Sequence, residues 1–219
     1  VAFSALGGTA FYGCRVGNDD LGSIYLNGLN EAGIKTAAQS ISEGVTGTCM
    51  VLISPDSERT MHTYLGITAE LTAEQIDFEP LKAAKWLYIE GYLSTSDTAR
   101  VAVKQARELA KAHGVKIALS LSDPAMVQYA RQGLEELLDD GVDLLFCNEQ
   151  EALMFSNTET LDAAIEVLKS KNQHIVITQG ANGAVIIDPE QQFHVAGREV
   201  HAVDTNGAGD AFAGAFLAA

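Results

Sequence analysis

Residues 115–155 read VKIALSLSDPAMVQYARQGLEELLDDGVDLLFCNEQEALMF and contain two short apolar runs separated by a helical segment. The first run, Val115 to Leu121, precedes Asp123-Pro124, an N-cap residue with proline at the first helical position. The second run, Asp143 to Cys147, leads directly into a polar segment that begins at Asn148. A strand, a helix and a second strand in this order predict parallel strands and an α/β fold.

The same alternation continues on both sides of this stretch. Further strands are predicted at 9–16, 86–90, 174–178, 183–188 and 193–203, and helices at 20–32, 97–113 and 211–219. We therefore expect a mostly parallel sheet with helices on both faces. In such sheets ligands bind beyond the carboxyl ends of the strands, and polar or glycine-rich groups follow each predicted strand here.

Residues 34–64 do not fit this alternation and predict a small β-sheet. Two β-rich pieces, 46–54 and 60–64, are separated by the turn residues 55–58, which predicts a hairpin. We therefore expect two parts: an α/β core of residues 1–33 and 65–219, and a β-rich insertion of residues 34–64.

Both ends of the sequence are apolar and helical in character. Residues 1–6 resemble the end of a helix that is closed by Gly7-Gly8, and residues 211–219 contain no charged side chain. Because natural chains seldom begin and end inside buried helices, we expect the core to be truncated at both ends.

Composition excludes several classes of function. The 219 residues are 47% hydrophobic and 20% charged, which suits a sizeable α/β domain, and the net charge of −15 argues against nucleic acid as a partner. No apolar run is long enough for a membrane span, and we expect no membrane partner. Cys14, Cys49 and Cys147 lack CxxC spacing and predict reduced thiols in a cytoplasmic protein.

The segment from Val203 to Asp210, VDTNGAGD, carries the most specific chemistry of the chain. Its glycines lie where a strand leads into a helix, and unpaired amides at a helix start form an anion site. A carboxylate repels phosphate, so Asp210 makes better sense as a base that takes a proton from a hydroxyl. The alternative is an ordinary helix start, with Asp210 as a charge that complements the helix dipole.

These residues resemble the D-T-x-G-A-G-D signature of the ribokinase/PfkB carbohydrate-kinase family. The resemblance implies a ribokinase-like three-layer sandwich with a small β-sheet lid. It also implies that Asp210 is the catalytic base and that Gly207, Ala208 and Gly209 form the anion hole. The runs at 15–20, 46–49 and 58–61 look like the adenosine-kinase-like branch of the family.

Two further motifs match this family. Asn148 and Glu151 correspond to its N-x-x-E motif, which implies Mg²⁺ held by these two residues, through water where the metal is not bound directly. Alone, these residues would more simply complement the helix dipole. Thr178, Gly180 and Gly183 match a T-x-G-x-x-G turn along the nucleotide, to which Asn148 is also assigned; taken alone, this segment is a hairpin turn.

The resemblance implies further candidates. Asp204 and Asn206 are candidates for a monovalent-cation site that holds K⁺. Arg59, in the lid segment, is either a solvated hairpin charge or a clamp near the substrate. In the family, the lid closes over the acceptor and excludes water, and its strands often form a homodimer interface.

The sequence therefore predicts an ATP-dependent phosphotransferase with a small-molecule sugar or nucleoside as acceptor, adenosine being favoured. A kinase for a free sugar such as ribose or fructose, and a non-catalytic nucleotide or sugar sensor on the same fold, remain alternatives. The P-loop motif G-x-x-x-x-G-K-[ST] and the kinase H-R-D loop are absent from the sequence, as is the G-x-G-x-x-G of dehydrogenases.

Overall fold

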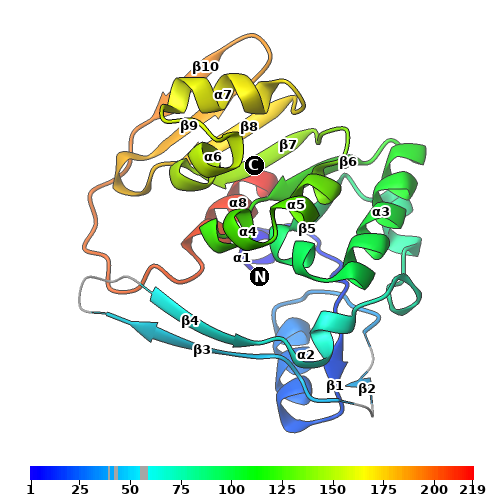
Figure 1. Ribbon diagram of the computed structural model, residues 1–219. Helices are drawn as coiled ribbons and strands as arrows, with labels where there is room; N and C mark the ends of the chain where they lie inside the picture. Colours follow the sequence, from blue (N-terminus) through cyan, green and yellow to red (C-terminus); the bar gives the residue numbers. More distant parts are fainter. Residues whose placement is uncertain (39, 42–43, 55–58) are drawn as a thin grey trace. The chain divides into compact units, whose positions relative to one another are not determined.

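The computed structural model describes residues 1–38, 40–41, 44–54 and 59–219, without the side chains of residues 40, 41 and 59. The chain divides into two compact units (Figure 1). The first unit comprises Val1–Asp77 and His201–Ala219, and the second comprises Phe78–Val200. The predicted lid segment, 34–64, belongs to the first unit, and its role as a lid stays a prediction.

The second unit is built on a mixed, mostly parallel sheet of six strands. The strands are β5 (Trp86–Glu90), β6 (Lys116–Ser120), β7 (Leu144–Asn148), β8 (His174–Thr178), β9 (Ala184–Ile187) and β10 (Gln192–Val195). They lie in the order β10-β9-β8-β7-β6-β5. Strands β5 to β8 are parallel, whereas β9 and β10 are antiparallel additions at one edge. The predicted α/β class with a mostly parallel sheet is thus confirmed.

Helices connect the parallel strands and pack against the sheet (Figure 1). They are α3 (Asp97–Ala112), α4 (Pro124–Tyr129), α5 (Arg131–Leu138), α6 (Glu149–Ser156) and α7 (Leu161–Lys169). Asp123 caps α4 as predicted, and its Oδ1 accepts a hydrogen bond of 2.8 Å from the amide of Ala125. The core lies between helices and strands, where Leu119, Leu134 and Leu145 are completely buried.

The first unit contains three α-helices and two pairs of strands among its described residues. They are α1 (Ala2–Ala5), β1 (Val16–Gly17), α2 (Asp20–Glu31), β2 (Ser40–Ile41), β3 (Thr48–Ile53), β4 (Arg59–Tyr64) and α8 (Ala208–Ala218). Helices α1 and α8 pack closely at Gly214. A Cβ atom at this position would lie 2.8 Å from the amide nitrogen of Phe3, so the contact needs a glycine. Within the described part of the chain, no helix has the length and apolarity needed to cross a membrane.

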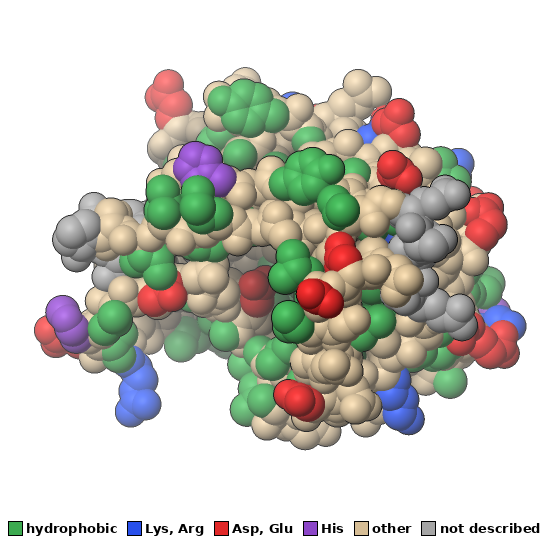
Figure 2. All heavy atoms as spheres, turned by 90° about the horizontal axis from the view of Figure 1, so that it is seen from below, with side chains coloured by type: hydrophobic (Ala, Val, Ile, Leu, Met, Phe, Trp, Pro, Cys, Tyr) green, Lys and Arg blue, Asp and Glu red, His purple; other side chains and the backbone are tan. Residues whose placement is uncertain are grey.

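Strands β3 and β4 form the predicted hairpin, with Thr48 opposite Tyr64 and Ile53 opposite Arg59. The predicted turn at 55–58 lies outside the described residues. Met50, Leu52 and Tyr64 are more than half exposed. Figure 2 shows hydrophobic side chains at several places on the face of the molecule seen from below. A two-stranded hairpin is marginally stable alone, so these apolar groups favour further pairing of the hairpin.

Asp19 and Thr46 tie the start of α2 to the segment that enters the hairpin. The hydroxyl of the buried Thr46 donates to Asp19 Oδ1 at 2.6 Å and accepts from the amide of Gly17 at 2.9 Å. Asp19 also accepts from the amides of Gly22 and Thr46, each at 2.8 Å. These bonds, led by that of the Thr46 hydroxyl, hold the pKa of Asp19 below its ordinary value.

We expect Thr46→Val to lower the free energy of unfolding by about 1–3 kcal/mol, because the buried amide of Gly17 loses its acceptor. A carboxyl whose pKa is lowered by folding adds stability above its unfolded pKa, and this stability disappears as the pH falls through the lowered value. The variant should therefore lose less stability than the wild type on acidification. Urea unfolding at several pH values measures both effects, with Thr48→Val in the exposed strand as control. Equal losses in the two variants would contradict the assignment.

Two predicted strands are wrong in extent. Between residues 9 and 16, the pairing found among the described residues is one bridge of Phe11 with Lys35 and the start of β1, where Val16 lies opposite Ser40. The strand predicted at 193–203 ends at Val195. Val195 pairs with Ala184, the first residue of β9, so β9 offers no partner to the residues after Val195. Helix α8 begins at Ala208, before the predicted residue 211.

Candidate active site

The start of α8 carries backbone amides that are free to bind an anion. Within the described residues, the amides of Gly207, Gly209 and Asp210 have no hydrogen-bond acceptor, whereas the amide of Ala208 donates to the carbonyl of Thr205 at 3.1 Å. Gly207 is the N-cap residue, with φ +75°, a conformation that favours glycine. Three unpaired N–H groups and the positive end of the helix dipole can hold a phosphoryl group.

The carboxylate of Asp210 lies next to these amides. A Cβ atom built on Gly207 would lie 3.8 Å from Asp210 Oδ2, so the carboxylate stands beside the glycine turn. The side chain is exposed, and no hydrogen bond to it occurs within the described residues. An anion site with a free carboxylate at its edge can accept a proton from a hydroxyl while negative charge is held by the amides.

Asp204 and Asn206 shape the loop before the helix. Asp204 Oδ1 accepts a hydrogen bond of 2.7 Å from the amide of Asn206, which forms a local turn of the Asx type. Both side chains are exposed. The second oxygen of Asp204 and the main-chain carbonyl of Asn206 are the oxygen atoms that a monovalent cation could use here.

Asn148 and Glu151 cap each other at the start of α6. Asn148 Oδ1 accepts from the amide of Glu151 at 2.7 Å, and Glu151 Oε2 accepts from the amide of Asn148 at 2.9 Å. Asn148 Nδ2 also donates to Glu151 Oε1 at 2.7 Å. Glu151 is only 4% exposed, so its carboxylate holds Asn148 in a reciprocal capping box. The motif thus has a structural function in addition to any role in metal binding.

Burial also affects the neighbouring thiol. Cys147 is the last buried residue of β7, and burial together with the negative charge of Glu151 raises its pKa well above the ordinary value. Cys147 therefore stays a neutral thiol at physiological pH and contributes packing rather than a nucleophile. All three cysteines of the chain are free.

Thr178, Gly180 and Gly183 form the predicted turn between β8 and β9. Gly180 has φ +56° and Gly183 has φ +97°. A Cβ atom on Gly183 would lie 1.9 Å from the carbonyl oxygen of Val195, whereas a Cβ atom on Gly180 would meet nothing within 4 Å. Thr178 is the direct neighbour of Asn148 in the parallel pairing of β7 and β8. The structure therefore brings the N-x-x-E and T-x-G-x-x-G motifs together at the carboxyl ends of the neighbouring strands β7 and β8.

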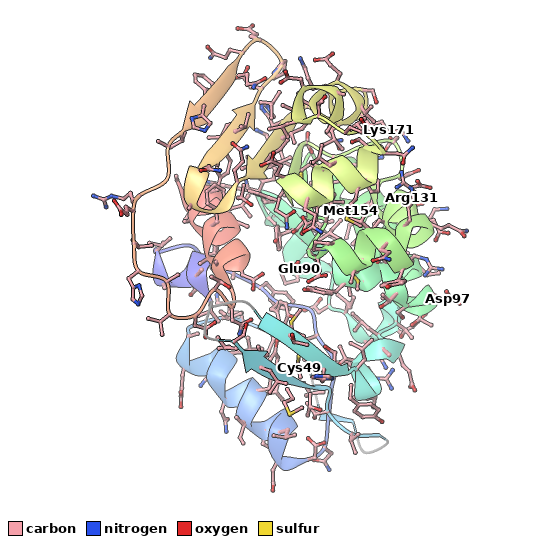
Figure 3. The ribbon with its side chains drawn as sticks, turned by 60° about the vertical axis from the view of Figure 1, so that its left-hand side comes forward. Cys49, Glu90, Asp97, Arg131, Met154 and Lys171 are labelled. Atoms are coloured by element: carbon pink, nitrogen blue, oxygen red, sulfur yellow. The ribbon has the colours of Figure 1, made fainter. Side chains whose placement is uncertain are left out.

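Sequence reasoning missed two features at the carboxyl ends of the parallel strands. Gln179 Nε2 donates to Glu149 Oε2 at 3.0 Å, which links the turn to the start of α6. Both residues stand at positions written x in the two motif patterns. Ser122 has φ +71°, and its hydroxyl donates to Glu90 at 2.8 Å and accepts from the amide of Gly91 at 2.7 Å. Glu90 ends β5 and is labelled in Figure 3. The polar strand ends were visible in the sequence, but nothing in it indicated the left-handed backbone of Ser122.

The predicted site residues fall into two groups. Asp204, Asn206, Gly207, Ala208, Gly209 and Asp210 belong to the first unit, and Asn148, Glu151, Thr178, Gly180 and Gly183 belong to the second. Each group is ordered by its own hydrogen bonds, as described above. Arg59 lies on β4 in the first unit, and its side chain is outside the described part of the structure.

An α/β fold, and a helix start whose amides can bind an anion beside a carboxylate, are features expected of phosphoryl-transferring proteins. Comparison with known proteins makes this class specific, since the chain matches the family model described as pfkB family carbohydrate kinase over residues 1–219. The chain belongs to the pfkB family. The predicted family, the ribokinase-like fold and the prediction of a sugar or nucleoside kinase are thereby confirmed.

Individual relatives show how far the similarity extends. Adenosine kinase of Saccharomyces cerevisiae is 30% identical over 96% of this chain and 65% of its own length. The solved structure of adenosine kinase from Sinorhizobium meliloti is 34% identical, with a TM-score of 0.94 over 99% of this chain and 67% of that one. A putative ribokinase II from E. coli, solved in complex with ATP and Mg²⁺, is 27% identical, with a TM-score of 0.89 over 99% of this chain and 71% of that one. The chain thus spans about two thirds of the length of these relatives.

Proposed function

We propose that the whole protein transfers the γ-phosphate of ATP to a hydroxyl group of a nucleoside, with adenosine as the preferred acceptor. The observation that carries the proposal is the start of α8, where the amides of Gly207, Gly209 and Asp210 have no acceptor within the described residues and the exposed carboxylate of Asp210 stands beside Gly207. An anion site without a base would suit a phosphate-binding sensor equally well. The exposed carboxylate beside it favours catalysis, because a carboxylate hinders phosphate binding unless it has a use.

In the proposed reaction, Asp210 takes the proton of the acceptor hydroxyl while the hydroxyl oxygen attacks the γ-phosphorus. A new phosphorus–oxygen bond forms, the bond to the bridging oxygen of ADP breaks, and ADP leaves with the released electron pair. The amides of Gly207, Gly209 and Asp210 hold the charge of the transferred group. Ala208 donates its amide to Thr205, so its part in the anion hole stays a prediction.

The residues present fit a Mg²⁺ ion held through its own water molecules. Each carboxylate oxygen of Glu151 accepts a hydrogen bond from Asn148, and Mg²⁺ usually keeps several waters when bound to a protein, so these two residues can hold the ion without replacing its water shell. Asn148 and Glu151 would hold the ion, which neutralises phosphate charge when bound. This suits a chain with a net charge of −15, which offers no general positive field to a nucleotide.

The preference for adenosine rests on the relatives named adenosine kinase, including the S. meliloti structure at 34% identity. An ADP-release assay on the full-length protein with adenosine, other nucleosides, ribose and fructose tests it. We expect the highest kcat/KM with adenosine. A preference for ribose or fructose would assign the protein to the free-sugar branch, and ligand binding without ADP production would identify a sensor.

Four subsidiary predictions complete the proposal. Asp204 and the carbonyl of Asn206 would hold K⁺, and Thr178, Gly180 and Gly183 would lie along the nucleotide. Arg59 would act in the lid near the substrate, and the exposed apolar hairpin β3–β4 would form a homodimer interface. Replacing K⁺ by a larger organic cation in the assay, and measuring the oligomeric state of the full-length protein, tests the first and the last. The three free cysteines suit a cytoplasmic location.

A further inference from the structure

Three Asn-Gly pairs occur in the chain: Asn27-Gly28, Asn182-Gly183 and Asn206-Gly207. In such a pair, the backbone nitrogen of the glycine can attack the side-chain amide carbon of the asparagine. A carbon–nitrogen bond forms, ammonia leaves, and the resulting succinimide ring is opened by water to aspartate or isoaspartate. Glycine favours the attack because it has no Cβ atom and allows unusual backbone conformations. The attacking nitrogen must first lose its proton, which a hydrogen bond in the native fold opposes.

The structure distinguishes the three pairs by the partner of the glycine amide. Gly28 lies in the interior of α2, where the helical hydrogen bonds hold the backbone. The amide of Gly183 donates to the carbonyl of Gly180 at 3.1 Å. The amide of Gly207 has no acceptor within the described residues, and the side chain of Asn206 is exposed.

The conformation of the loop adds to this difference. The hydrogen bond to Asp204 uses the amide of Asn206 and not that of Gly207. Gly207 has φ +75° at the N-cap of α8, outside the regular helix. Gly183 has a positive φ as well, but close backbone contacts with Val195 and Gly197 restrict it. All three asparagines are exposed, so the pairs differ in the glycine nitrogen, which among the described residues lacks an acceptor only in the third pair.

We propose that Asn206 is a site of spontaneous deamidation and isoaspartate formation. The modification itself depends only on the geometry above, whereas its effect on activity rests on the proposed function. Isoaspartate would insert one additional methylene group into the backbone directly before the amides of Gly207 and Gly209. Either product would also add a carboxylate beside the site that holds the phosphoryl group, so the modified protein would be inactive.

The free amide therefore has two opposite consequences. It must be unpaired to bind an anion, and for the same reason its nitrogen is available for attack on Asn206. An anion bound to the Gly207 amide would withdraw this nitrogen from the reaction. We expect ATP with Mg²⁺ to slow deamidation at Asn206 without slowing it at Asn27, which lies in α2.

The test is an incubation of the folded full-length protein in mildly alkaline buffer, followed by peptide mapping with mass spectrometry at all three asparagines. A denatured sample treated in parallel gives the intrinsic rate of each pair. We expect Asn206 to deamidate at least several-fold faster than Asn182 and Asn27 in the folded protein, and the three rates to converge after denaturation. An intact Asn206, or a faster reaction at Asn182, would overturn the proposal.

Variants relate the modification to activity. Each protein is compared with its own activity at the start of the incubation. Asn206→Ala should lose activity more slowly than the wild type, and Asn27→Ala should lose it at the wild-type rate. Deamidated Asn206 in a protein that never released ADP would contradict the proposed function and support the present inference. An active enzyme with unmodified Asn206 would do the reverse.

Discussion

Asp210→Asn is expected to lower kcat by roughly 10²- to 10⁴-fold and to leave the KM for ATP nearly unchanged, because an amide cannot accept the proton of the acceptor hydroxyl. The substitution is nearly isosteric, and the amides of Gly207 and Gly209 do not depend on the carboxylate. Removal of one negative charge beside the anion site should strengthen ATP binding slightly, if at all. Steady-state ADP release by the full-length protein measures both parameters.

Asp20→Asn is the matched control for this substitution. Asp20 is also an exposed carboxylate in the first turn of a helix of the same unit, but there the side chain of the N-cap residue Asp19 already accepts from the amide of Gly22. The control should keep the wild-type kcat. If Asp210→Asn turned over as fast as Asp20→Asn, Asp210 would be an ordinary helix-dipole charge, and the proton would have to go elsewhere.

Gly183→Ala is expected to lower the free energy of unfolding by at least about 3 kcal/mol, since two independent costs add. An alanine at φ +97° is strained, and its Cβ atom would lie 1.9 Å from the carbonyl oxygen of Val195. The β8–β9 turn must shift to relieve the contact. Because we propose that this turn lies along the nucleotide, the KM for ATP should rise as well.

Gly180→Ala separates these two costs. Gly180 also has a positive φ, at +56°, but its Cβ atom would meet no neighbour within 4 Å. This variant should lose only about 1 kcal/mol, the conformational cost alone. Urea unfolding of both variants, with ATP titrations on the folded proteins, makes the comparison. Equal losses of stability would show that the backbone contact with Val195 is relieved without cost.

The local part of the fold was predictable because its signals lie close together in the sequence. Asp123-Pro124 is a helix-start signal contained in two adjacent residues, and the apolar run before Asn148 is long enough for one buried strand. The predictions failed where a strand depended on its partner. Within the described residues, segment 9–16 pairs only through Phe11 with Lys35 and Val16 with Ser40, and the pairing with β9 reaches no further along the chain than Val195.

The candidate site shows the same division. The glycine pattern before Asp210 predicted an anion site, and the spacing of Asn148 and Glu151 predicted that they share a helix face. Their hydrogen bonds could not be read from the pattern. Glu151 uses both carboxylate oxygens to hold Asn148, and the amide of Ala208 is paired whereas its neighbours are free.

By itself, the sequence determined the class of fold, the family signature and the residues that carry its chemistry, because periodicity, capping and motif spacing are local properties. Only the tertiary structure decided which groups are free to act. It paired Asn148 with Thr178 across two strands and gave Ser122 a left-handed backbone conformation. Among the described residues, it left the amides of Gly207 and Gly209 without acceptors. These outcomes depend on which segments lie beside one another, and a hydrogen bond used within the fold is no longer available to a ligand.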